Sequence, residues 1–138
     1  MTTTRVTPEP LDLAAHVAAV SGPRVGAVAT FLGTVRDHDP SVDGDVVGLD
    51  YSAHPDAGDV LHRLADAAAC TDGVLGVAVS HRTGMLGVGE AAIVAAVASA
   101  HRALAFDVCR DLVETVKAEL PVWKREVLRD GSHVWVGL

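Results

Sequence analysis

Long apolar segments are missing from this sequence of 138 residues. Its most apolar run, residues 91–98, is far shorter than the roughly 20 residues that a transmembrane helix requires. Residues 1–10 also lack the apolar core of a signal peptide. We therefore expect a cytoplasmic protein that has no membrane partner.

Cysteine and positive charge are scarce as well. Cys70 and Cys109 are the only two cysteines and form no CxxC motif, which favours two buried thiols over a disulfide. The net charge is −7, from 11 basic and 18 acidic residues. This balance argues against a nucleic-acid partner, because phosphate backbones select clustered lysine and arginine.

The sequence also lacks the patterns that hold a metal ion or a dinucleotide. Its histidines form neither an HxH nor an HExxH motif, and the acidic segment 37–45 has neither the spacing nor the closing glutamate of an EF-hand. The glycines of residues 83–89 do not lead into a helix, as those of a dinucleotide fingerprint would. We therefore predict no metal site and no cofactor.

What the sequence does contain is typical of a globular protein. Hydrophobic residues make up 49% and aromatic residues 4%, so we expect a core of small side chains in tight contacts between helices and sheet. Residues 1–138 have the usual length of one domain, and we predict a single domain.

Apolar periodicity predicts helices over residues 11–20 and 55–69, and a long helix from Ser99, as its N-cap, to Leu120. Pro121 ends this helix, because a residue before proline avoids helical geometry. The predicted strands are residues 25–35, 46–53, 73–81, 91–98, 122–128 and 133–136, with residues 2–10 forming a frayed end or an edge strand.

The order of these elements predicts the fold class. The buried strand 25–35 and the strand 46–53 are suited to form a hairpin, and residues 83–89 form a glycine-rich turn. Strands 122–128 and 133–136 form a second hairpin, which turns at Asp130–Gly131. Mixed helices and hairpins indicate an α+β domain with a largely antiparallel sheet.

The chain contains only two lysines, Lys117 and Lys124, one on each side of Pro121. A helix that turns at once into a strand can bring both ammonium groups toward one pocket. An ordinary explanation is that lysine suits a helix C-terminus and an edge strand. Lysine, unlike arginine, can also lose its proton when its pKa is lowered, and can then act in catalysis.

Two other basic segments are candidates for binding an anion. His101 and Arg102 follow Ser99 at the start of the long helix, where free backbone N–H groups attract anions. Arg36 follows the strand 25–35 at the edge of the sheet. A capped helix start explains the first segment equally well, and a solvated loop is by itself the preferred explanation of the second. Together with the two lysines, these side chains would form a basic pocket for a small phosphorylated ligand.

At these same residues the sequence resembles the catalytic, or large, subunits of molybdopterin synthase. The similar stretches are residues 31–36 (FLGTVR), 99–102 (SAHR) and 121–126 (PVWKRE), in the family's order and spacing. Lys117 precedes the proline as in the family, and residues 81–84 (HRTG) resemble its HRxG turn. The resemblance extends from about residue 25 to residue 136.

The resemblance implies a sulfurtransferase with an α/β hammerhead-type fold that carries an additional small hairpin or sheet. The enzyme would convert cyclic pyranopterin monophosphate to molybdopterin. Its sulfur would come from the C-terminal glycine thiocarboxylate of a small ubiquitin-like subunit, which inserts into the large subunit. Two large subunits would form a homodimer at the core of a heterotetramer.

The resemblance also assigns a substrate site. Its members are Thr34, Val35, Arg36, His101, Arg102, Lys117, Lys124, Arg125 and Glu126. Of these, Arg36, His101 and Arg102 would neutralise the substrate phosphate through charge-assisted hydrogen bonds.

The two lysines would carry the chemistry. Lys117 would orient the thiocarboxylate tail and assist its acyl transfer and hydrolysis, and Lys124 would stabilise charge that develops on the substrate. Glu126 would hold Lys124 or Arg125 in place. Two alternatives remain open: a non-catalytic dimeric module that binds a small anion, and an inactive paralogue.

Overall fold

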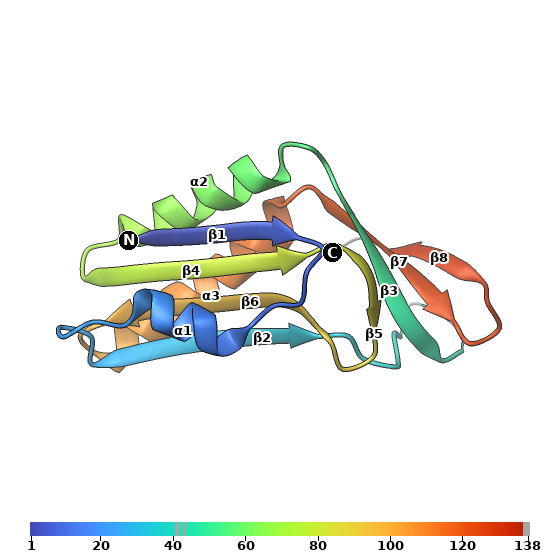
Figure 1. Ribbon diagram of the computed structural model, residues 1–138, viewed down its shortest axis with the longest axis horizontal. Helices are drawn as coiled ribbons and strands as arrows, with labels where there is room; N and C mark the ends of the chain where they lie inside the picture. Colours follow the sequence, from blue (N-terminus) through green and yellow to red (C-terminus); the bar gives the residue numbers. More distant parts are fainter. Residues whose placement is uncertain (41, 43, 137–138) are drawn as a thin grey trace.

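The computed structural model describes residues 1–40, 42 and 44–136, and these form two four-stranded sheets and three helices (Figure 1). Sheet A has the strand order β1 (Thr2–Thr7), β4 (Val74–Arg82), β6 (Ala91–Ser99) and β2 (Ala27–Thr34). Sheet B has the order β5 (Gly84–Gly87), β3 (Val46–Ala53), β7 (Val122–Leu128) and β8 (His133–Val136). Among the strands that the structure describes, β1 and β4 pair in parallel and the other pairs are antiparallel. The predicted α+β class and largely antiparallel sheet are therefore confirmed.

Helices cover both faces of sheet A. The helices α2 (Ala57–Ala69) and α3 (Arg102–Glu119) pack on one face, and α1 (Leu13–Val20) packs on the other (Figure 1). Side chains alternate along a strand, so Ala95 and Val97 of β6 join the large core, whereas Ala96 and Ala98 join the small core beneath α1. Small side chains on both faces of β6 let helices approach closely, as the composition predicted.

The helix ends follow from particular residues. Asp12 caps α1, because its carboxylate accepts a hydrogen bond from the N–H of Ala15 at 3.3 Å. The long helix α3 ends at Leu120, whose backbone is already extended before Pro121. Its start differs from the prediction: the N-cap is His101, and Ser99 is still the last residue of β6. The Ser99 hydroxyl donates to the carbonyl of His101 rather than to a helical N–H.

Strand pairing differs from the prediction in three places. Strands β2 and β3 form no hairpin, because β2 pairs with β6 and β3 pairs with β5 and β7 in the other sheet. The strand β2 was expected to be buried but lies at the edge of sheet A, with Leu32 47% exposed. The glycine-rich segment expected to be a turn contains β5, which pairs with β3 through Gly84 and Gly87.

The two thiols also differ from each other. Cys109 is buried in the core as predicted, whereas Cys70 is exposed as the residue that follows α2, so the prediction of two buried thiols is wrong for Cys70. Among the residues that the structure describes, no helix is long and apolar enough to cross a membrane.

Candidate active site

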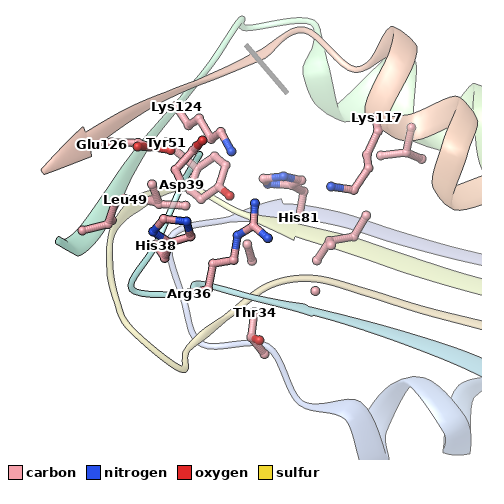
Figure 2. Close-up of a pocket in the computed structure, with 15 residues that line it drawn as sticks. Thr34, Arg36, His38, Asp39, Leu49, Tyr51, His81, Lys117, Lys124 and Glu126 are labelled. Carbon is pink, nitrogen blue, oxygen red and sulfur yellow. The ribbon is translucent and has the colours of Figure 1, made fainter. Parts of the chain in front are cut away.

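A cavity of about 320 Å³ lies where the end of sheet A meets sheet B and the last turn of α3 (Figure 2). Its lining combines apolar side chains of both sheets with an unusual concentration of ionisable groups. The ionisable residues are Arg36, His38, Asp39, Tyr51, His81, Lys117, Lys124 and Glu126. They come from four elements and from the segment that follows β2, so folding alone brings them together.

The local structure explains how each strand aims its side chains at the cavity. Along β4, His81 lies on the same face as Val77 and Val79, which belong to the large core. On β7, Lys124 and Glu126 are two residues apart and both line the cavity. Pro121 ends α3, and β7 begins at the next residue, so Lys117 and Lys124 reach one cavity. The predicted proximity of the two lysines is confirmed.

The cavity is rich in positive charge on an acidic protein. Arg36, Lys117 and Lys124 provide three cations, and Figure 2 shows their side chains directed toward a common space. Among the residues that the structure describes, the carboxyl groups that line the same cavity are those of Asp39 and Glu126. Because the whole chain carries a net charge of −7, this concentration of cations is local and suited to a small anion.

The carboxyl group of Glu126 is buried, since the residue is only 2% exposed. Burial raises its pKa, and hydrogen bonding and charge repulsion with Asp39 raise it further, to about 7, against the attraction of Lys124 and Arg36. Its Oε2 atom has no hydrogen-bond partner among the described residues. Glu126 is therefore partly protonated at neutral pH and can donate or accept a proton inside the cavity.

Two aromatic rings form the inner wall. The rings of Tyr51 and His81 meet edge to face, with centroids 5.0 Å apart and planes at 73°. Burial, helped by the charge of Glu126, raises the pKa of Tyr51 to about 12, so its hydroxyl stays protonated. Burial lowers the pKa of His81, the hydrogen bond to the backbone of Arg82 opposes this, and the charge of Lys117 lowers it further.

Known proteins share this architecture and sequence. The family model described as MoaE protein matches residues 6–119. The chain is 43% identical over 136 residues to molybdopterin synthase catalytic subunit 1 of Mycobacterium tuberculosis, with 96% of this chain and 89% of that protein covered. The chain belongs to the MoaE family. It is thus a catalytic subunit of molybdopterin synthase, a sulfurtransferase of molybdenum cofactor biosynthesis.

Other MoaE relatives agree. The catalytic subunit of Thermoplasma volcanium is 39% identical over 127 residues, which cover 91% of this chain and 89% of that protein. The crystal structure of molybdopterin synthase from Staphylococcus aureus matches with a TM-score of 0.87 at 27% identity, covering 96% of both chains. A solved complex of subunits 1 and 2 of the Helicobacter pylori molybdopterin-converting factor shares the fold at 18% identity, with a TM-score of 0.75 and 98% and 89% covered.

Five of the nine residues that the sequence analysis predicted for a substrate site line the cavity. They are Thr34, Arg36, Lys117, Lys124 and Glu126. Val35 lies beside it but is buried, and its backbone is fully used: its N–H donates to Glu90 and its carbonyl accepts from Gly89. Val35 therefore anchors the segment that carries Arg36.

The other three predicted site residues do not line the cavity. His101 and Arg102 are exposed at the start of α3, and Arg102 is roughly 22 Å from Lys117 along the helix axis at 1.5 Å per residue. Arg125 points to the opposite face of β7, where it forms an ion pair with Asp50 at 2.7 Å. Glu126 therefore does not hold Arg125. A single copy of the chain does not bring all the predicted cations into one pocket.

Sequence reasoning missed Asp39, Tyr51 and His81. The acidic segment around Asp39 showed no cation-binding spacing, and His81 was noted only as part of the HRTG stretch that resembles the family's turn. Alternation along the strands was the available signal for Tyr51 and His81, because it directs both toward the core side of their sheets. No sequence pattern indicated that Asp39 lies against Glu126.

Proposed function

We propose that the cavity is the site where sulfur passes from the C-terminal thiocarboxylate of a small ubiquitin-like subunit to cyclic pyranopterin monophosphate. The observation that carries the proposal is the group of three cations, Arg36, Lys117 and Lys124, in one cavity of an acidic protein. Both reactants are anions, so the site must offset their mutual repulsion. Two unit charges 4 Å apart near a protein surface repel by about 4 kcal/mol.

The positions of the two lysines support separate duties. Lys117 is exposed at the end of α3, where a tail that enters from solvent meets it first. Lys124 is half-buried on β7 beside Glu126, deeper among the groups that would surround the pterin. Lys117 orients the thiocarboxylate and stabilises the acyl oxyanion during its hydrolysis, and Lys124 stabilises charge on the substrate.

The sulfur transfer itself requires a substitution on the substrate and a hydrolysis of the tail. The thiocarboxylate sulfur attacks an oxygen-bearing carbon of the substrate and forms a C–S bond, while the C–O bond at that carbon breaks and its electron pair leaves with the oxygen. Water then attacks the acyl carbon, and the bond between this carbon and the sulfur breaks. The sulfur stays on the pterin, and the tail leaves as a carboxylate. Glu126, with a pKa of about 7, is suited to exchange protons with the substrate during these steps.

We also propose a homodimeric core in which each site uses residues from both copies. Within one copy, the length of α3 separates Arg102 from Lys117, so His101 and Arg102 serve the neighbouring copy's cavity and bind the substrate phosphate. One small subunit binds each end of the dimer and forms a heterotetramer.

The assignment of Arg125 to the substrate site and the cytoplasmic location of the protein stay predictions.

Reconstitution tests the proposed reaction. The purified chain is mixed with a thiocarboxylated small subunit and cyclic pyranopterin monophosphate, and molybdopterin is measured. We expect product only when all three are present. Absence of product with a small subunit that is active alongside another MoaE protein would contradict the proposal.

Subunit mixing tests the shared site. Lys117→Ala and Arg102→Ala proteins should each be inactive, but a mixed dimer contains one intact site. After random exchange of equal amounts, about a quarter of the wild-type activity should return, since half the dimers are mixed and each has one good site. A mixture that stays inactive after verified exchange would show that each copy builds its site alone.

A further inference from the structure

The imidazole of His81 is held in one tautomer. Its Nδ1 atom lies 2.8 Å from the carbonyl oxygen of Arg82, and a carbonyl oxygen can only accept a hydrogen bond, so Nδ1 carries the hydrogen. The neutral ring therefore has its lone pair on Nε2. This nitrogen has no hydrogen-bond partner among the described residues.

His81 and Lys117 face each other across the cavity. Figure 2 shows the Lys117 side chain extending from α3 toward the ring of His81. His81 is only 4% exposed, and its ring packs edge to face with the ring of Tyr51, so the imidazole is held in place, whereas Lys117 is exposed. Burial and the charge of Lys117 both keep His81 neutral.

We propose that His81 is a positioning residue for Lys117: its Nε2 accepts a hydrogen bond from the Lys117 ammonium and aims it into the cavity. A neutral acceptor suits this task better than a carboxylate, which would cancel the positive charge that an anionic tail requires. The inference rests on the proposed function of Lys117 and adds the residue that orients it.

Acid should release this contact. When the pH falls through the pKa of His81, which burial holds below 6.5, the ring gains a proton on Nε2, loses its lone pair and repels Lys117. Among the described residues, the other charged or titratable groups that line this cavity are Tyr51 from β3, Lys124 and Glu126 from β7, and Arg36, His38 and Asp39 from the segment after β2. Of these, Glu126 titrates higher, near pH 7, so the two events separate.

The scarcity of lysine allows a direct test. A protein labelled with ¹³C at lysine Cε gives two NMR signals, since the chain has only Lys117 and Lys124, and a Lys124→Arg variant assigns them. The Lys117 signal should shift with an inflection below pH 6.5. This inflection should vanish in His81→Asn and persist in Ser80→Ala, the matched control, whose hydroxyl faces α1 and hydrogen-bonds His16.

Activity distinguishes two substitutions of the same histidine. Asparagine can replace Nδ1 and keep the bond to Arg82 but cannot reach the position of Nε2, whereas glutamine can place an oxygen there. We expect His81→Asn to lower kcat about tenfold or more, the effect of one hydrogen bond to a charged group, with KM little changed. His81→Gln should retain most activity.

Three results would overturn the inference: no Lys117 inflection in the wild-type protein, an inflection unchanged in His81→Asn, or equal losses in the two variants. If His81→Asn does not fold, the wild-type titration decides alone. A wild-type protein that forms no molybdopterin would contradict the proposed function, whereas the NMR titration would still test the contact.

Discussion

Replacing Glu126 by glutamine should stabilise the folded protein at alkaline pH. Glutamine has the shape of a protonated glutamate, and its amide can donate to Asp39 as the protonated carboxyl does. Above pH 7 the wild-type protein must instead keep a carboxylate that is 2% exposed beside a second carboxylate. The variant avoids this cost.

The structure gives the size of the effect. Burial and Asp39 raise the pKa of Glu126 from 4.5 to about 7, and each pKa unit corresponds to 1.36 kcal/mol. A carboxyl with a raised pKa in the folded state stabilises the fold while it is protonated, and this contribution disappears as the pH rises from about 4.5 through 7. At pH 8 the variant should therefore be more stable than wild type by about 3 kcal/mol, and near pH 4.5 by less than about 1 kcal/mol.

Urea unfolding at a series of pH values measures this difference. The control is Glu119→Gln, which removes an exposed carboxylate near the end of α3 and should change stability by less than about 0.5 kcal/mol. Two results would contradict the reasoning: a Glu126→Gln protein that is no more stable than wild type at pH 8, or a stability difference that does not depend on pH. Either would mean that burial and Asp39 do not raise the pKa of Glu126 as argued.

Three further substitutions test the site and the fold. Arg36→Ala should raise the KM for the phosphorylated substrate about tenfold or more, because a charge-assisted hydrogen bond contributes about 1.5–3 kcal/mol. The control Arg24→Ala, at an exposed arginine, should leave the KM unchanged. Equal KM values in the two variants would show that Arg36 does not bind the substrate. Val97→Ala should lower the free energy of unfolding by about 2 kcal/mol, since Val97 is fully buried in β6 and the substitution removes two methyl groups. A loss below about 0.5 kcal/mol in urea unfolding would contradict the tight packing of Val97 in the core. Gly131→Ala should lower the free energy of unfolding by about 1 kcal/mol in the same assay, because the φ of Gly131 is +86°. Gly58→Ala, in open space on α2, should instead stabilise the folded protein. Similar effects at both positions would refute the turn geometry at Gly131.

Local rules predicted the part of the site that depends on neighbouring residues. The break at Pro121 places the end of α3 next to the start of β7, so Lys117 and Lys124 approach one cavity through only a few intervening residues. The hairpin turned at Asp130–Gly131 was predicted for the same reason, because short turns are set by their own residues.

Pairing between distant strands could not be predicted in this way. The apolar run of β2 is compatible with a central or an edge strand. In the structure β2 pairs with β6, and both strands pack beneath α3. The fold therefore places β2 and β3 in different sheets, and the cavity forms between those sheets. For the same reason, Asp39 and His81 could not be predicted as site residues, because their positions depend on how distant strands pair.

The separation of His101 from Lys117 was already implied by the predicted helix, which places them at opposite ends. What the sequence does not indicate is which copy of the chain each basic residue serves. The length of α3 turns this ambiguity into the specific proposal of a shared site.

The most direct test of the account is the turnover of Lys117→Arg with the thiocarboxylated small subunit and the cyclic substrate. Arginine keeps the positive charge, but its planar guanidinium is larger than an ammonium and cannot place the charge at the same point, so binding should survive while most turnover is lost. Single-turnover kinetics and equilibrium binding of the substrate separate the two. A loss of turnover with unchanged substrate binding is predicted, and full turnover in Lys117→Arg would contradict a catalytic role for this lysine.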